Sequence, residues 1–510
     1  MMPNGEGVGG GTSNGNGDGG DNVVGFPATR EERQQLRQAR LDAEKRRLLN
    51  VFIDEGGGQL FRTPDKTAYA DLIIDGHRET WEVRSQEFRH AYIRYLEREL
   101  NRALASDTPL QALLFKSAQR KAAINAAIED FENRAICASI KRDVRVRVAD
   151  HQGEIYVDLC NDGWEAVRIT AAGWSVVDAP PVRFVRTDGM LSLPYPERGG
   201  KVEALRPFLN AADADFPLAV AHLLAYLRPR GPYPILDVLG PPGAAKTSLM
   251  RRLRRLVDPH VVETTPPPAS GDDLFIAARN SHVQAFENVS SLSVKMSDHY
   301  CRLATGGGMR TRRRFTNTRE TLFRGARPIM IEGIADIMKR PDILDRATVF
   351  EVQRLVDYAS EEEQDLDFDR QRPAILGGLL DMMVRGLRER PTVRLTGPKP
   401  RLVDFALWAV ACGVDRFEEA YAHNRQNAVN VLLEYDPVAK AVRGLMVSRR
   451  QWRGTATKLF NAVGTVAEIR TPRMLSDSLR LVAPMLETVG IYVVHGKRMN
   501  TERPLTIERR

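Results

Sequence analysis

The sequence has little cysteine and no long apolar run, and each absence narrows the kind of protein it can be. Four cysteines stand far apart in 510 residues, without a C-x-x-C pair. This spacing argues against a zinc site and a disulfide framework and fits scattered buried thiols in a reducing compartment. No apolar run approaches the ~20 residues that span a bilayer, and the N-terminus has no apolar signal core. We therefore expect a cytoplasmic protein with no membrane partner.

The composition is that of a folded chain with several domains. Hydrophobic residues make up 43% and charged residues 27% of the chain, enough to bury hydrophobic cores. At roughly 150 residues per domain, the 510 residues predict about three domains. The net charge of +8 permits an acidic polymer as partner without establishing one. A Gly/Asn-rich tail at 1–28 is expected to be disordered, and a helical arm at 29–66 follows it.

Residues 67–192 are expected to form an α+β accessory domain. The Asp75-Gly76 dipeptide predicts a hairpin turn, two helices follow at about 85–105 and 109–133, and alternating strands come next. Several polar side chains lack metal-ligand or triad spacing and predict no catalytic site: His77, Glu79, His90 and His151. The Pro/Gly-rich stretch "LPYPERGG" marks the boundary to a second domain at 200–357.

The stretch "VLGPPGAAKTSLM" predicts a nucleotide site. It lies between an expected strand and an expected helix, the context that a phosphate-binding loop requires. Backbone N–H groups would hold the β-phosphate of ATP, Lys246 would reach the β- and γ-oxygens, and Thr247 would bind Mg²⁺. Ala245 replaces the usual glycine, and its methyl fits if the residue keeps negative φ. The expected ATP-binding residues are Gly240, Pro241, Pro242, Gly243, Ala244, Ala245, Lys246, Thr247 and Ser248.

A short apolar strand ending in Glu287-Asn288 predicts the second part of this site. The first acid of such a pair, Glu287, would orient the Mg²⁺ shell, and the second position would polarise the attacking water. Asn288 is an amide and cannot accept a proton. Either another carboxylate does that work or hydrolysis is slow.

A glycine turn followed by a basic strand predicts a nucleic-acid contact. Between Arg302 and Arg327 there are eight arginines and one acid, Glu320. Closely spaced arginines supply phosphate pairing and an aromatic ring supplies stacking, although an exposed basic hairpin without a ligand would have the same composition. The expected contacts are Arg310, Arg312, Arg313, Arg314, Phe315 and Arg319.

The C-terminal part is expected to contain an acidic connector, a helical region at 372–435 and a winged helix-turn-helix at 436–510. Helices are predicted at 374–390 and 402–431 in the helical region. In the winged unit, Thr455 and Thr471-Pro472 are typical helix starts. A two-stranded wing would follow, so this unit either binds DNA or docks a protein. The candidate phosphate contacts are Arg473, Arg480, Lys497 and Arg498.

The order of these elements resembles superfamily 3 helicases of the AAA+ class, and more closely the ATPase half of primase-helicases of phages and integrated elements. The resemblance covers about residues 230–355. It implies a ring, usually hexameric, with the hairpin at about 306–319 gripping one DNA strand. It also implies that Arg346 is the arginine finger for a neighbouring protomer and that Glu332 takes the sensor position.

Two departures from the family pattern are expected to matter. The family usually has Asn at the sensor, where this chain has Glu332, and an acid where it has Asn288. If the two strands lie side by side, Glu332 and Asn288 have exchanged roles and Glu332 is the base. The alternative is a structural carboxylate paired with a nearby arginine.

The sequence therefore predicts a multidomain α/β protein with an AAA+ P-loop ATPase core. The leading hypothesis is an ATP-dependent DNA helicase that replicates a phage or mobile element and acts on single-stranded and duplex DNA. The alternatives are a nucleotide-controlled loader or regulator with weak hydrolysis, and a partner-sensing ATPase of a defence system. We find no primase carboxylate motif, so a separate primase is an expected partner.

Overall fold

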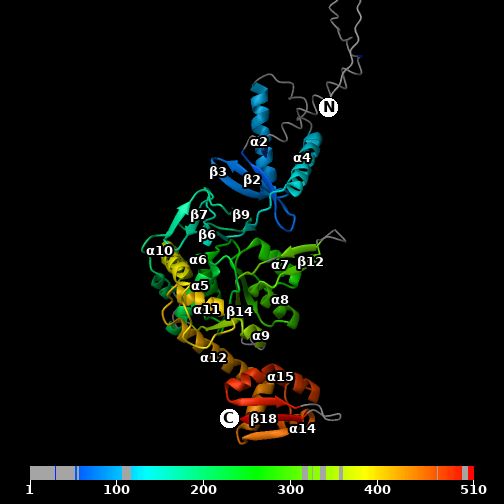
Figure 1. Cartoon of the computed structure of the whole chain (residues 1–510), viewed down its shortest axis with the longest axis vertical. Helices are drawn as coiled ribbons and strands as arrows, with labels where there is room; N and C mark the ends of the chain where they lie inside the picture. The colour runs from blue at the N-terminus through cyan, green and yellow to red at the C-terminus, as the bar shows by residue number, and fades with distance from the viewer. Residues whose placement is uncertain are drawn as a thin grey trace, which may run out of the picture.

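The structure is a computed structural model, and it describes most of the chain as a mixed α/β protein of several units stacked along its longest axis (Figure 1). The described residues are 29, 52–53, 57–105, 117–312, 320–323, 325–333, 341–354, 360–467, 469–496 and 504–510. The expected tail at 1–28 and residues 30–51 of the expected arm lie outside them. Within the described ranges, no helix is long and apolar enough to cross a membrane.

The N-terminal unit is a three-stranded antiparallel sheet covered by two helices. Its hairpin turns at Asp75 and Gly76, whose φ angles of 49° and 87° are the left-handed values that a tight turn requires. The hairpin prediction is therefore confirmed. Phe88, Tyr92 and Phe131 pack edge to face under the sheet. The elements are β1 (Gln59–Arg62), β2 (Ala68–Ile74), β3 (His77–Glu82), α2 (Gln86–Ala105) and α4 (Ser117–Cys137).

A second sheet follows and joins the central unit. Its inward side chains, such as Val157 and Ile169, belong to the same core as helices of the nucleotide-binding unit. Arg147, fully buried, also pairs with Asp258 of that unit at 3.0 Å. The accessory region is thus two units, and the second is continuous with the next core. This sheet has four antiparallel strands in the order β5 (Val148–His151), β6 (Glu154–Asp158), β7 (Ala166–Ile169) and β8 (Trp174–Val177), and β4 (Val144–Arg145) and β9 (Arg183–Phe184) form a separate parallel pair.

A four-stranded parallel sheet of order β11-β14-β10-β15 forms the centre of the molecule. Near-continuous apolar runs supply its strands, as expected for strands buried on both faces. Its edge strand β15 is closed by Asn424, whose side chain accepts the Val349 N–H at 3.0 Å and donates to the Val349 carbonyl. The strands are β10 (Ile235–Leu239), β11 (Gln284–Val289), β14 (Ile329–Gly333) and β15 (Ala347–Glu351).

Helices cover both faces of this sheet. Leu236 and Val238 of β10 face one core, which contains α5 and α6, and Ile235 and Leu239 face the other, which contains α7 and α8. All but one of the residues of α5 are buried, as its apolar sequence requires. The elements here are η1 (Val202–Phe208), η2 (Asp213–Asp215), α5 (Phe216–Tyr226), α6 (Lys246–Val257), α7 (Gly271–Asn280), α8 (Val294–Thr305) and α9 (Pro341–Leu344).

The prediction of an acidic connector at 354–373 is wrong from residue 361 on, and residues 355–359 lie outside the described ranges. The part from residue 361 belongs to one long helix, α10 (Glu361–Glu389), whose N-cap Ser360 accepts a hydrogen bond from the Glu363 N–H. Three glutamates in its first turn favour this start because they interact with the positive end of the helix dipole. The single helix expected at 402–431 is two helices, α11 (Val403–Ala411) and α12 (Phe417–Tyr435), separated at Gly413, whose φ is 77°.

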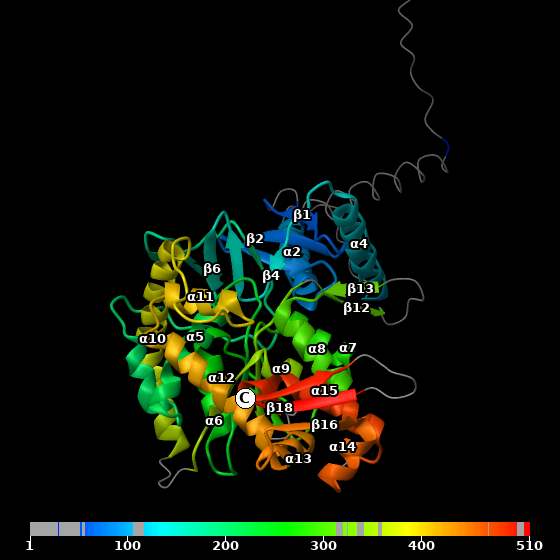
Figure 2. The ribbon, with the colours of Figure 1, turned by 60° about the horizontal axis from the view of Figure 1, so that its bottom comes forward.

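The C-terminal unit lies at the end of α12 and combines three helices with a small sheet of order β16-β18-β17 (Figure 2). Thr455 and Thr471 accept hydrogen bonds from the Lys458 and Met474 N–H groups, so both predicted caps are confirmed. The elements are α13 (Pro437–Met446), β16 (Gln451–Thr455), α14 (Ala456–Val463), α15 (Pro472–Thr488), β17 (Ile491–His495) and β18 (Pro504–Arg509).

All four cysteines are free thiols, as the spacing predicts. Cys301 and Cys412 are buried, but Cys137 is exposed and Cys160 is half-buried, so the expectation of four interior thiols is only partly right.

Candidate nucleotide site

The loop predicted to bind phosphate connects β10 to α6, at the carboxyl edge of the central sheet. A Cβ at Gly240 would lie 2.5 Å from the Val352 carbonyl oxygen, so only glycine fits where the loop leaves the strand. Gly243 takes a φ of 78°. Both glycines are therefore needed for the shape of this loop.

The conformation of Ala245 differs from the expectation. Its φ of 54° and ψ of 34° are left-handed, so the condition under which its methyl would fit freely is not met. A left-handed conformation costs a residue with a Cβ roughly 1–2 kcal/mol. Ala245 is therefore a strained position at the N-cap of α6, where glycine would carry no such cost.

Two side chains hold the loop in this shape. The Lys246 ammonium donates to the carbonyl oxygens of Gly240 at 2.9 Å and Pro241 at 3.1 Å. The Asn210 amide donates to the carbonyl oxygens of Ala244 and Gln353, both at 2.8 Å. Asn210 was not found from the sequence, because an isolated Asn in a loop carries no motif. Ser248, another predicted contact, donates instead to Glu361 at 3.2 Å.

Strands β11 and β14 are neighbours, which brings the two expected acidic positions together. Phe286 pairs with Ile331 and Val289 with Gly333, so β11 contains one extra residue between these pairs. Asn288 takes up this bulge with a φ of 55°, a value that Asn tolerates well. Glu287 and Glu332 consequently lie at the same edge of the sheet, while the Asn288 side chain is exposed.

Glu332 contacts the residue that was expected to bind the metal. The Thr247 hydroxyl donates to Glu332 Oε1 at 2.9 Å, and Glu332 Oε2 is buried with no hydrogen-bond partner among the described residues. Burial raises the pKa of Glu332, and the nearby Glu287 carboxylate adds to this, while the Thr247 hydroxyl and the Lys246 ammonium act in the opposite direction. One oxygen of this carboxyl group thus lacks a hydrogen bond within the described part of the chain, and the other is bonded to the Thr247 hydroxyl in the first turn of α6.

Glu287 is held from the other side of the site. The Thr264 hydroxyl donates to Glu287 Oε2 at 2.7 Å, and the Glu287 N–H donates to the Thr265 carbonyl at 2.9 Å. The segment around Thr264 therefore runs beside β11 like a short additional strand and fixes the position of Glu287. Thr264 was also missed from the sequence, since its partner lies 23 residues away.

Arg346 lies at the other end of the sheet from the loop of its own chain. Its carbonyl oxygen accepts the Ile235 N–H at 2.8 Å, beside the first residue of β10, whereas the loop follows the last residue. The separation is about four residues of strand, or roughly 13 Å at 3.3 Å per residue. Arg346 is half-buried.

The basic segment forms the predicted hairpin at its base. Strands β12 (Met309–Arg312) and β13 (Glu320–Phe323) pair antiparallel, with Arg310 opposite Leu322 and Arg312 opposite Glu320. The remaining expected contacts, Arg313, Arg314, Phe315 and Arg319, lie outside the described residues.

Two regions of the chain match models of known families. Residues 202–420 match the model described as "Actinomycete integrative conjugative element replication protein", and residues 438–510 match the model described as "AICE RepA C-terminal domain". The expected resemblance to mobile-element replication proteins is confirmed. No curated protein matches the chain.

Two solved structures align with most of this chain at low sequence identity. A chain titled "The A form apo structure of NrS-1 C terminal region-CTR" aligns at 12% identity with a TM-score of 0.39, over 91% of this chain and 99% of that chain. A chain titled "SCCmec type IV Cch - active helicase" aligns at 10% identity with a TM-score of 0.42, over 88% and 92%.

The C-terminal family match contains the candidate phosphate contacts of α15. The Arg473 side chain is 92% exposed, and Arg480 pairs with Asp477 at 2.9 Å. Both arginines therefore lie on the surface of the helix. Lys497 and Arg498 lie outside the described residues.

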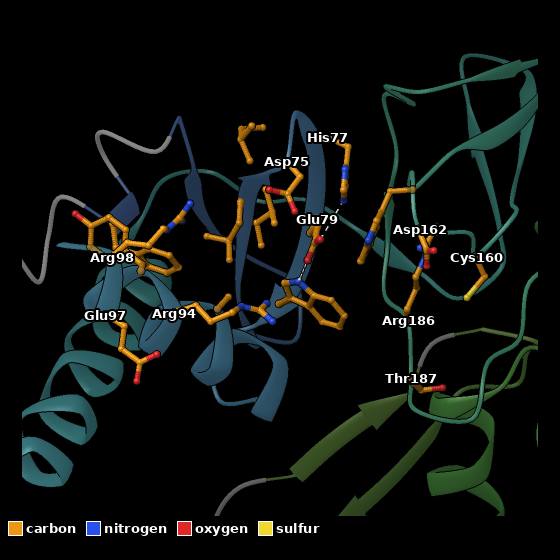
Figure 3. Close-up of a pocket in the computed structure, with 18 of the residues that line it drawn as sticks. Asp75, His77, Glu79, Arg94, Glu97, Arg98, Cys160, Asp162, Arg186 and Thr187 are labelled. Atoms are coloured by element: carbon orange, nitrogen blue, oxygen red, sulfur yellow. Dashed lines mark hydrogen bonds and ion pairs between the residues drawn. The ribbon is translucent and has the colours of Figure 1, made fainter. Parts of the chain in front are cut away.

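The region before residue 202 lies outside both matched ranges and contains a cavity of about 890 Å³ (Figure 3). His77 and Glu79 from β3 pair at 3.1 Å, and Arg94 and Arg98 from α2 also line the cavity. Across the described residues, no group of three or more His, Cys, Asp or Glu is placed to hold a metal ion. His77 and Glu79 thus form a pair, and with His90 and His151 they make no metal-binding cluster.

Proposed function

We propose that this chain is an ATP-dependent DNA helicase that replicates a mobile element and acts as a ring. The observation that carries the proposal is the meeting of three groups at one sheet edge: the loop lysine Lys246, the Thr247 hydroxyl and the buried carboxyl of Glu332 bonded to it. The family match to replication proteins supports the same conclusion.

The residues of the loop fit ATP and Mg²⁺. Lys246 donates to the Gly240 and Pro241 carbonyls, which a phosphate can replace, and α6 starts at Lys246, so its first N–H groups can contribute to phosphate binding. The unpartnered Glu332 Oε2 is a buried acceptor of the kind that the water shell of Mg²⁺ satisfies. The metal would neutralise charge on the phosphates, while Thr247 and Glu332 would orient it.

The contacts favour a division of labour between the two acids. Glu332 is bonded to Thr247, so it suits the metal shell, whereas Glu287 is held by Thr264 and suits the orientation of the attacking water. This allocation reverses the roles that the sequence alone indicates, in which Glu287 orients the metal and Glu332 is the base. The exposed Asn288 takes part in neither role.

The position of Arg346 supports a ring. It lies at the end of the sheet away from its own loop, so it can reach a γ-phosphate only in a neighbouring protomer. We therefore propose Arg346 as the arginine finger and a hexamer as the assembly that places it.

DNA contacts are proposed for two surfaces. The β12–β13 hairpin, which includes Arg310 and Arg312, would grip one strand, as the family resemblance implies. The C-terminal order of helix, strand, two helices and hairpin is that of a winged helix, whose α15 carries Arg473 and Arg480.

Particle size and strand displacement test the proposal. Light scattering of the wild-type chain with ATP and single-stranded DNA should give a particle several times the monomer mass of 57.1 kDa. Arg346→Ala should keep that size and lose ATP turnover, and a permanent monomer would contradict the ring.

A loader or regulator with weak hydrolysis is the second candidate, because the position beside Glu287 is the amide Asn288 rather than an acid. It would bind DNA in response to nucleotide without displacing a strand. A strand-displacement assay with excess ATP separates the two candidates.

A further inference from the structure

A cleft of about 480 Å³ lies between the N-terminal unit and the central unit. Its walls come from the turn between β1 and β2, the short strand β4, the last turn of α7 and the segment before β14. Three arginines from three of these elements line it: Arg145, Arg279 and Arg327. The cleft therefore concentrates positive charge at the junction of two units.

The two acidic side chains that line the cleft are already engaged. Asp65 accepts hydrogen bonds from the hydroxyls of Thr63 and Thr67, the second at 3.2 Å, within its own turn. Asp143 pairs with Arg145 at 3.2 Å. Neither carboxylate is hydrogen-bonded to Arg279.

Arg279 is the least compensated of the three arginines. It is half-buried beside Tyr69 and makes no hydrogen bond or ion pair with any residue that the structure describes. The negative end of α7 favours a cation there, but it leaves the five N–H donors of the guanidinium unused. A half-buried guanidinium with free donors is suited to an anionic ligand.

Arg327 adds to the surplus of positive charge. Its Nε donates to the Ala278 carbonyl at 2.8 Å, so the side chain is fixed against the end of α7. Burial, together with the positive charge of Arg145, lowers the pKa of Arg327 to about 10. A bound anion would relieve this crowding of cations.

The cleft lies at the base of the basic hairpin. Arg327 follows the last residue of β13, Phe323, by four positions. In both overall views the hairpin lies next to α7, on the side of the molecule that carries the N-terminal unit (Figures 1 and 2). A strand held by the hairpin thus passes close to the cleft.

We propose that this cleft binds backbone phosphates of the DNA strand that the hairpin grips, with Arg279 as the main contact and Arg145 and Arg327 beside it. The inference rests on the proposed function for the identity of the strand. If the cleft binds DNA in this way, the N-terminal unit forms one wall of the DNA-binding site.

The experiment measures binding of the full chain to a single-stranded oligonucleotide at several salt concentrations, without nucleotide. Arg279→Ala should reduce the slope of log affinity against log salt by about 0.7 and weaken binding roughly fivefold at 0.1 M salt. Its thermal midpoint should change little, because no hydrogen bond or ion pair is lost and the interaction with the α7 dipole is weak. Arg370→Ala is the matched control, since Arg370 is an exposed arginine of α10 that pairs with Asp367 at 2.7 Å.

Equal salt slopes for Arg279→Ala and Arg370→Ala would overturn the proposal. A second result would also overturn it. If inorganic phosphate stabilises the wild type but not Arg279→Ala, and both chains have the same salt slope for DNA, the cleft binds free anions rather than DNA. ATP turnover without DNA should be the same in Arg279→Ala and wild type. If the wild type has no turnover, the helicase proposal fails, while a reduced salt slope still supports the cleft.

Discussion

The Thr247 hydroxyl donates a hydrogen bond to Glu332 Oε1 across 2.9 Å, and this contact joins the loop after β10 to the neighbouring strand β14. Because β11 lies on the other side of β14, Glu287 reaches the same edge of the sheet. The site therefore contains two carboxyl groups, each held by a different threonine. Their separate partners predict separate roles.

Substitution of each acid by its amide should separate those roles. Glu287→Gln should lower ATP turnover about 100-fold or more with little effect on the Mg²⁺ requirement, because it removes the group that orients water. Glu332→Gln should raise the Mg²⁺ concentration for half-maximal turnover by about tenfold or more, because it removes a group of the metal shell. Turnover measured across Mg²⁺ concentrations checks both.

The opposite result would support the assignment made from the sequence, with Glu332 as the base and Glu287 in the metal shell. A Glu332→Gln chain that binds Mg²⁺ and ATP normally but has lost turnover would make Glu332 the base. Turnover retained at saturating Mg²⁺ would exclude it from that role.

Ala245→Gly should stabilise the chain. Glycine removes a left-handed strain of about 1–2 kcal/mol, and the greater freedom of the unfolded chain returns about 0.4–1 kcal/mol of this. The expected net gain is roughly 0.5–1 kcal/mol in the free energy of unfolding, measured by urea titration. Gly397→Ala is a useful reference because it makes the reverse exchange, glycine to alanine, at a position where an added Cβ meets nothing within 4 Å. A lower stability of Ala245→Gly would contradict the strain.

Arg147→Met should be strongly destabilising. Arg147 is fully buried, pairs with Asp258 at 3.0 Å and donates to the carbonyl oxygens of Asp158 and Leu191. Its loss leaves a buried carboxylate without its main partner, at a cost of about 3–5 kcal/mol. Arg168→Met, which breaks the exposed pair with Glu154, should cost less than about 1 kcal/mol. Urea unfolding followed by tryptophan fluorescence compares the two, and similar costs would exclude a structural role for the buried pair.

Asp237 predicts a pH-dependent stability. It is 1% exposed in β10, and neither carboxyl oxygen has a hydrogen-bond partner among the described residues. Burial raises the pKa of Asp237 from 3.8 to about 7. The stability that the neutral form contributes is complete below about pH 4 and is lost as the pH rises towards 7, a change of about 4 kcal/mol at about 1.4 kcal/mol per pKa unit.

Asp237→Asn tests this directly because the amide cannot ionise. The variant should be more stable than wild type at pH 8 and nearly equal at pH 4, with thermal midpoints as the measurement. Asp162→Asn, at an exposed position, should show no such difference. A wild-type advantage for Asp237 at pH 8 would contradict the account.

Local signals in the sequence predicted the local structure well. The Asp75-Gly76 turn, the caps at Thr455 and Thr471 and the loop between β10 and α6 each depend on a few adjacent residues, and the structure contains all of them. The start of α10 was missed because its charged first turns were interpreted as a connector. Ser360 and the three following glutamates are in fact a helix start.

Contacts between distant segments could not be predicted in the same way. Thr264 reaches Glu287 and Asn210 reaches Ala244 only because the fold brings them together, and neither residue stands in a motif. The left-handed φ of Ala245 was equally hidden, since the sequence indicates glycine preference but not the backbone angle that an alanine takes in its place.

The stimulation of ATP turnover by single-stranded DNA tests the central claim most directly. The account predicts that DNA increases the turnover of the wild-type chain several-fold, and that Lys246→Ala abolishes turnover with and without DNA. Arg310→Ala combined with Arg312→Ala should keep the turnover seen without DNA and lose the stimulation. A wild-type rate that DNA leaves unchanged would contradict a helicase that draws a strand through its hairpins.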